Sequence, residues 1–119
     1  MVRLVNNISL FSYGTLQYAE IVHKVVGTRF PFEKAVLENY ARYLVRGAVY
    51  PAIIEEPHAR VEGVLYHGLN ASHIQRLDRY EGPGYLRIES TVVTVKGDCS
   101  QAMVYVFNNT RRNLSLIHI

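Results

Sequence analysis

The stretch YLRIESTVVTVKGDCSQAMVYVF, residues 85–107, carries the clearest strand pattern in the sequence. Apolar and polar residues alternate from Tyr85 to Val92, as in a strand with one buried face. The alternation changes phase at the Val92–Val93 pair, which predicts a β-bulge there. KGDCS is a typical turn sequence, and QAMVYVF is a second strand that can pair back antiparallel to the first. The segment therefore predicts an antiparallel hairpin.

The segment NASHIQRLDRYEG, residues 70–82, precedes that hairpin and predicts the clearest helix in the chain. Asn70 can cap its N-terminus, and Gly82 can end it in a left-handed conformation. Between them, Ile74, Leu77 and Tyr80 recur at every third position and share one helix face.

The rest of the chain gives shorter strand and helix signals. The expected strands are a buried one over 8–13, one bulged or two separate strands over 35–49, a short extended piece between Pro51 and Pro57, and one over 61–69. A short helix is expected over 17–27, with Gly27 just past its end. Strands outnumber helices by about two to one, which indicates an α+β fold with a curved, mainly antiparallel sheet or barrel.

Length and composition exclude several classes of protein. The chain has 119 residues, of which 49% are hydrophobic and 19% charged, as expected for one compact domain rather than a linker or coiled coil. No apolar run reaches the ~18 residues of a membrane helix, and the N-terminus has no signal-peptide pattern. The net charge of +3 comes without a basic stripe, so no nucleic-acid partner is expected. We expect a cytoplasmic protein without membrane contact.

The C-terminal residues LSLIHI, 114–119, have two possible explanations. They are either an ordinary C-terminal tail or a sequence that is not part of the natural protein. They are the frame translation of CTGTCTCTTATACACATC, which resembles a transposon end used in preparing sequencing libraries. We favour that interpretation and leave these residues out of the fold prediction. The domain is then expected over residues 1–113, cut short at its C-terminus, with the natural chain continuing past Arg112.

Metal and nucleophile motifs are absent from the sequence. Cys99 is the only cysteine, which excludes an internal disulfide or a Cys-x-x-Cys pair. An incidental turn cysteine is favoured over a catalytic thiol, which would need a nearby histidine. The five histidines include no His-x-His or His-x-x-x-His pair, so no metal site is predicted. FSYGT is not a Gly-x-Ser-x-Gly elbow, so a Ser-His-Asp site is equally unsupported.

SYGTLQ, residues 12–17, is a first candidate for binding chemistry. A glycine at a strand-to-helix turn allows backbone N–H groups to converge on an anion or a developing oxyanion. The motif lacks the glycines and lysine of nucleotide-binding loops. Taken alone, a plain strand-ending turn remains the favoured interpretation.

LDRYEGPGYLR, which begins at Leu77, is the second candidate. Glu81 falls in the last helical turn, where the helix dipole disfavours a negative charge, and such local violations cluster at functional sites. Apolar neighbours would desolvate the carboxyl group and raise its pKa toward the range of a general base. Asp78 lies one turn earlier and can share the helix face. Taken alone, a solvated helix-end glutamate remains favoured.

The ordered set LFSYGTLQ, GAVYPAI, VEGVLYHGL, LDRYEGPGYLRI and AMVYVF is similar to the γ-glutamylcyclotransferase-like family, in its γ-glutamylamine cyclotransferase and avirulence-induced-gene-like branch. The resemblance runs from about residue 10 to residue 107. YGTL by itself is a weak motif, but its combination with a Leu-Asp-x-Tyr-Glu-Gly helix end and a Tyr-x-Arg strand is specific.

The resemblance implies a small mixed β-barrel with flanking helices. It implies an enzyme that converts a γ-glutamyl amine into 5-oxoproline and the free amine, without cofactor or metal. Glu81 corresponds to the general acid/base. The implied substrate-binding residues are Tyr13, Gly14, Thr15, Leu16, Tyr50 and Tyr85. The segment 17–33 follows no fixed family pattern, and the join EGPGY is shorter than in relatives that insert several residues there, so the resemblance implies no particular amine.

Three functions are weighed against one another. The first is a cyclotransferase acting on a small γ-glutamyl amine or peptide. The second is a non-catalytic module that binds a small ligand on the same barrel. The third is a related acyl-removing enzyme of a biosynthetic pathway with a different leaving group. Glu81 favours an enzyme, because a pure binding module needs no acid/base at that position.

Overall fold

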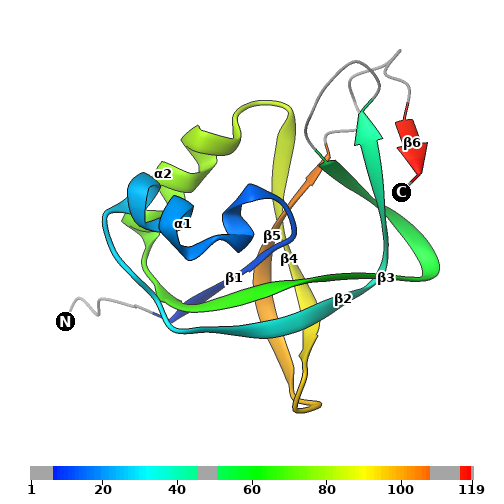
Figure 1. The fold of residues 1–119 in the computed structure, drawn as a ribbon, viewed down its shortest axis with the longest axis horizontal. Helices are drawn as coiled ribbons and strands as arrows, with labels where there is room; N and C mark the ends of the chain where they lie inside the picture. The colour runs from blue at the N-terminus through cyan, green and yellow to red at the C-terminus, as the bar shows by residue number, and fades with distance from the viewer. Residues whose placement is uncertain (1–6, 46–50, 108–115, 119) are drawn as a thin grey trace.

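The protein folds as a closed mixed β-barrel of five strands, described by a computed structural model over residues 7–45, 51–107 and 116–118. The barrel strands are β1 (Ile8–Ser12), β2 (Phe32–Val45), β3 (Pro51–Leu69), β4 (Tyr85–Thr94) and β5 (Cys99–Phe107) (Figure 1). They follow the order β3-β1-β5-β4-β2, and β2 pairs with β3 to close the ring. The β1–β5 pair is parallel and the other pairs are antiparallel. The predicted α+β fold is confirmed.

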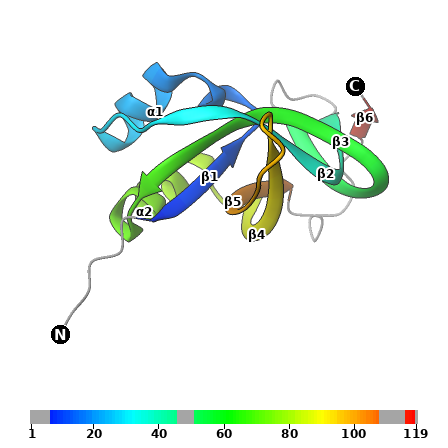
Figure 2. The same cartoon turned by 90° about the horizontal axis from the view of Figure 1, so that it is seen from below.

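The helices cover one end of the barrel, opposite β6 (Leu116–His118) (Figure 2). They are the 3₁₀ helix η1 (Thr15–Gln17), α1 (Ala19–Val26) and α2 (Ala71–Glu81), and α1 contacts α2. One cluster of buried side chains fills the barrel and includes Phe11 and Tyr13. A second, which includes Leu10 and Tyr105, lies between the barrel and the helices. Burial of apolar side chains on both faces of β1 therefore holds the helices on the barrel.

The N-terminal cap of α2 is the one predicted, but the conformation of the glycine at its C-terminal end is not. The Asn70 side chain accepts a hydrogen bond from the backbone N–H of His73 at 2.9 Å, which caps the helix. Ile74 and Leu77 are buried, whereas Tyr80 is 46% exposed. Gly82 has φ 79° and ψ −176°, so it is not left-handed helical as predicted. Glycine alone adopts this conformation readily, and it turns the chain sharply from α2 toward β4.

β2 and β3 are longer than the sequence predicted. They pair along most of their length, with a register shift between Glu38 and Tyr40. Asn39 and His58 have positive φ there, and the His58 N–H donates to Asn39 Oδ1 at 3.2 Å. Pro57 therefore lies inside β3, at an irregularity where its missing N–H is tolerated. The interruption predicted at Gly47 lies outside the described residues, and the predicted break between 57 and 61 does not exist.

The predicted bulge at Val92–Val93 is wrong. β4 pairs with β5 without a register shift from Tyr85 to Val93. Val92 is fully buried inside the barrel, while Val93 faces the other way, half-buried, and pairs with β2. Both faces of this strand end are partly covered, so two adjacent valines fit a regular strand. The predicted hairpin turn is confirmed, with the Thr94 N–H donating to the Asp98 carbonyl at 2.8 Å.

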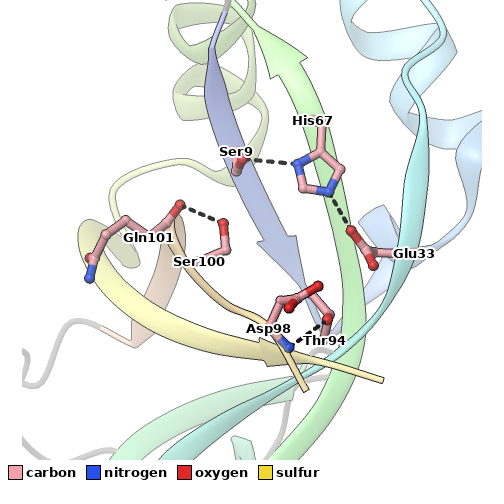
Figure 3. Close-up of polar contacts among 7 residues, drawn as sticks. All are labelled: Ser9, Glu33, His67, Thr94, Asp98, Ser100 and Gln101. Carbon is pink, nitrogen blue, oxygen red and sulfur yellow. Dashed lines mark hydrogen bonds and ion pairs between the residues drawn. The ribbon is translucent and has the colours of Figure 1, made fainter. Parts of the chain in front are cut away.

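Close packing and polar contacts hold β1 beside its neighbours. A Cβ atom on Gly63 of β3 would lie 2.3 Å from the Ser12 carbonyl oxygen and 2.7 Å from Phe11 Cζ, so only glycine permits this approach. At the other end of β1, Ser9 Oγ lies 3.2 Å from His67 Nδ1, and His67 Nε2 lies 2.7 Å from Glu33 Oε2 (Figure 3). These side chains link β1, β3 and β2 in a row, and none of them lines the cavity described below.

Part of the C-terminal segment lies in a strand. β6 pairs antiparallel with the end of β2, with His118 opposite Tyr43. The proposed boundary at residue 113 lies outside the described residues and stays a prediction. No helix in the described part of the chain is long and apolar enough to cross a membrane, and the cytoplasmic location also stays a prediction.

Candidate active site

A cavity of about 350 Å³ lies where β1 ends and α2 ends. This is within the size range of small-ligand sites, roughly 300–1,000 Å³. Its walls come from the end of β1 and the loop after it, the last turn of α2, the start of β4 and one residue of β5. The lining residues are Phe11, Ser12, Tyr13, Gly14, Thr15, Leu16, Tyr80, Glu81, Gly84, Tyr85 and Tyr105.

The loop from Tyr13 to Leu16 forms one wall and is fixed at several points. The Tyr13 hydroxyl donates to the Tyr105 carbonyl oxygen, and Gln17 Nε2 donates to the Tyr13 carbonyl at 2.7 Å. Burial above all, followed by Tyr85 and Glu81, raises the pKa of Tyr13 well above its ordinary value, so it stays a donor. The loop is therefore held to β5 before any ligand binds.

The loop also meets α2 directly. Thr15 Oγ1 and the Tyr80 hydroxyl lie 3.0 Å apart and share a hydrogen bond at the exposed rim of the cavity. Deeper in the protein, the Tyr66 hydroxyl donates to the Leu16 carbonyl at 2.7 Å. The backbone that faces the cavity is therefore tied to β3, β5 and α2.

Glu81 lines the same cavity, at the C-terminal end of α2. Burial raises the pKa of its carboxyl group from 4.5 to about 7. The C-terminal end of the helix also disfavours a negative charge there. A carboxyl group with this pKa can both accept and release a proton near neutral pH.

Behind Glu81, one turn earlier on α2, Asp78 ties the helix to the hairpin. It accepts hydrogen bonds from Arg87 Nε at 2.8 Å, from Arg87 Nη2 at 3.2 Å and from the Tyr105 hydroxyl at 2.7 Å. Burial alone would raise the pKa of Asp78, but these bonds and the charge of Arg87 outweigh it and lower that pKa. Asp78 therefore stays charged and joins the end of α2 to β4 and β5.

The structure brings together Glu81 and most of the residues assigned to substrate binding. Tyr13, Gly14, Thr15, Leu16 and Tyr85 line the same cavity as Glu81. Tyr50 lies outside the described residues, and the roles of all these residues stay predictions. Among the described residues, no three His, Cys, Asp or Glu side chains are grouped so that they could hold a metal ion.

Sequence reasoning missed three polar residues of the cavity, namely Ser12, Tyr80 and Tyr105. The sequence pattern places Tyr80 in the apolar stripe of α2, with Ile74 and Leu77. Ser12 was passed over as part of the turn motif. Tyr105 belongs to β5, and its place beside β1 depends on a parallel pairing between strands far apart in the sequence, such as Leu10 with Met103. Only the helix-end position of Tyr80 could have been inferred locally.

Comparison with known proteins identifies the family. Residues 10–118 match the family described as gamma-glutamyl cyclotransferase, AIG2-like. The chain belongs to this AIG2-like cyclotransferase family. Two Arabidopsis thaliana relatives are AIG2-like protein C, 31% identical over 103 residues, and AIG2-like protein B, 30% identical over 95 residues. These alignments cover 84% and 80% of this chain but 59% and 54% of the relatives, so the chain spans little more than half their length.

Solved structures share the fold of this AIG2-like chain. A gamma-glutamyl cyclotransferase superimposes with a TM-score of 0.75 at 22% identity, covering 92% of this chain and 69% of that one. A yeast gamma-glutamyl cyclotransferase specific to glutathione superimposes with a TM-score of 0.64 at 15% identity, covering 86% of this chain and 69% of that one. At these identities the likeness shows the barrel and its flanking helices alone.

Proposed function

We propose that this AIG2-like protein is a γ-glutamyl cyclotransferase that converts a small γ-glutamyl amine or peptide into 5-oxoproline and the free amine. One observation carries the proposal: the partly buried Glu81 carboxyl group and the Tyr13–Leu16 loop line the same cavity. The family match is consistent with this activity. The identity of the amine is left open.

The proposed reaction is an intramolecular acyl transfer. The α-amino nitrogen of the substrate attacks its own γ-carbonyl carbon and closes a five-membered ring. The bond between that carbon and the leaving amine then breaks. Holding the substrate folded in the cavity supplies proximity, which is worth ~7–11 kcal/mol in well-oriented intramolecular reactions. No protein nucleophile is required.

Glu81 is proposed to move the proton in both steps. Its carboxylate takes a proton from the α-ammonium group, which frees the nitrogen lone pair for attack. The same carboxyl group then delivers that proton to the departing amine, while the ring nitrogen loses its second proton to solvent, so the protein returns to its starting state. A pKa of about 7 suits a group that must accept and release a proton in one cycle. Backbone N–H groups at Gly14 to Leu16 are proposed to hold the glutamyl moiety and the developing oxyanion.

A second candidate function is a non-catalytic module that binds a small ligand in the same cavity. The fixed loop and the cavity suit both functions. The raised pKa of Glu81 favours the enzyme, because it makes the carboxyl group costly to ionise and useful mainly for proton transfer. The third candidate, an acyl-removing enzyme with another leaving group, would use the same residues.

A screen of γ-glutamyl compounds for release of 5-oxoproline separates these candidates. The panel should include γ-glutamyl derivatives of small amines, of amino acids and of a lysine side chain. Turnover of at least one compound by the purified protein is the expected result. Tight binding of a panel member with no 5-oxoproline released would favour the binding module. Neither binding nor turnover across the panel would contradict the proposed function.

A further inference from the structure

Ser12, the last residue of β1, carries a buried hydroxyl group without a hydrogen-bond partner. The residue is 5% exposed, and its Oγ has no partner in the described part of the chain. Leaving a buried hydroxyl unpaired costs roughly 1–3 kcal/mol, so such groups usually have a reason. Thr94, which is similarly buried at 6% exposed, differs in that its Oγ1 accepts from the Asp98 N–H at 3.2 Å (Figure 3).

The position of Ser12 on β1 fixes the face of the strand that its side chain occupies. Side chains alternate between the two faces of a strand. Phe11 and Tyr13 belong to the cluster inside the barrel, and Leu10 to the cluster under the helices. Ser12 therefore lies on the same face of β1 as Leu10, the helix side of the barrel wall. It lines the cavity together with Glu81.

The other hydroxyl groups around the cavity already have partners. The Tyr13 hydroxyl donates to a backbone carbonyl, and the Tyr105 hydroxyl donates to Asp78. Thr15 and Tyr80 are bonded to each other, and Tyr85 also has an interaction partner. Among the described residues that line the cavity, Ser12 is therefore the one whose hydroxyl group has no partner and could bond to a bound molecule.

We propose that the Ser12 hydroxyl accepts a hydrogen bond from the α-amino group of the γ-glutamyl substrate. This inference rests on the proposed function. An α-amino group that gives one proton to Glu81 keeps two N–H bonds, and each needs an acceptor inside the cavity. The Ser12 oxygen, which has no other partner in the described part of the chain, provides one such acceptor. Holding one N–H there limits rotation about the Cα–N bond and aims the lone pair at the γ-carbonyl carbon.

Paired ligands and variants test this contact. The binding ligands are a γ-glutamyl amide that the protein turns over and the matching glutaryl amide, which lacks only the α-amino group. Binding is measured in a Glu81→Gln background, with and without Ser12→Ala, so that the amide is not consumed. Ser12→Thr keeps the hydroxyl, and Ser9→Ala removes a hydroxyl of β1 that does not line the cavity.

Ser12→Ala is expected to weaken binding of the γ-glutamyl amide by about 10- to 100-fold, as for loss of a hydrogen bond to a charged group. Binding of the glutaryl amide should not change, and the melting temperature should stay the same or rise. Ser12→Thr should restore most of the loss, and Ser9→Ala should have no effect on binding.

Two results would overturn the assignment of Ser12 alone. One is unchanged binding of the γ-glutamyl amide in Ser12→Ala by a protein whose wild type releases 5-oxoproline. The other is an equal loss for both amides, which would mean that Ser12 shapes the cavity without contacting the amino group. A wild type that neither binds nor turns over any γ-glutamyl compound would instead contradict the proposed function, and the Ser12 contact with it.

Discussion

At the scale of single residues, Glu81 is placed where ionisation is disfavoured. Burial raises its pKa from 4.5 to about 7, and the partial negative charge at the C-terminal end of α2 also disfavours ionisation. The folded protein therefore binds this proton more tightly than the unfolded chain does. The resulting stabilisation is complete below pH 4.5 and is lost as the pH rises through 7.

Glu81→Gln removes this dependence on pH. We expect the variant to gain roughly 2–3 kcal/mol in free energy of unfolding relative to wild type at pH 8.5, with little difference at pH 4.5. Chemical denaturation across this pH range measures the effect. Glu89→Gln, at an exposed position of β4, serves as the matched control. The same pH dependence in both variants would contradict the burial of Glu81.

Local sequence rules identified Glu81 but not Ser12. Glu81 could be found because a carboxylate in the last turn of a helix breaks a local preference. The unpaired hydroxyl of Ser12 breaks a rule that only the folded protein reveals, since burial and partners depend on strands distant in sequence. Residues that act through non-local packing are therefore invisible to a pattern search.

At the scale of elements, Asp78 holds the end of α2 in place. Its three hydrogen bonds reach both strands of the hairpin, and the Asp78 carbonyl accepts the Gly82 N–H at 3.0 Å. Asp78→Asn weakens the pairing with Arg87 but keeps the size of the side chain. We expect turnover to fall by less than ~10-fold and the free energy of unfolding to fall by about 1 kcal/mol.

A second bidentate carboxylate pair provides the control for Asp78→Asn. Arg29 contacts both oxygens of the exposed Glu20, at 2.8 and 3.1 Å. Glu20→Gln should change neither turnover nor stability measurably, because solvent screens the pair. A loss of turnover in Asp78→Asn as large as in Glu81→Gln would contradict a positioning role for Asp78.

Elements whose bounds depend on nearby residues were predicted from the sequence. Strands whose length depends on pairing with a distant strand were not. α2 follows from its Asn70 cap and its apolar stripe, and the β4–β5 hairpin follows from its turn. β3 was divided at Pro57 because proline usually interrupts a strand. The irregular pairing around Asn39 and His58 allows Pro57 to lie inside β3 without a backbone N–H. This irregularity exists only once β2 and β3 are paired.

At the scale of the whole molecule, closure of the barrel depends on β1. It pairs with β3 on one side and parallel with β5 on the other, and its last residue leads into the loop at the cavity. The barrel class follows from the strand-rich pattern and the family resemblance. The parallel pairing of β1 with β5 cannot be predicted from the sequence of either strand alone, because these are the first and the last barrel strands in the chain.

The C-terminal tail is expected to add little to this barrel. β6 contributes a three-residue strand at the edge of the sheet, paired with β2. We expect removal of residues 114–119 to lower the free energy of unfolding by less than ~2 kcal/mol, because a three-residue strand paired on one side contributes little. Thermal and chemical denaturation of the two chains measure the difference. A larger loss would show that the tail belongs to the domain.

The central claim is that Glu81 moves the proton during cyclisation. Glu81→Gln keeps the size and hydrogen-bonding capacity of the side chain but cannot accept the proton. Release of 5-oxoproline from the best γ-glutamyl compound of the screen is therefore the most direct measurement. We expect turnover to fall by ~10²–10⁴-fold with binding of the γ-glutamyl compound largely retained. Release at the wild-type rate by Glu81→Gln would contradict the account.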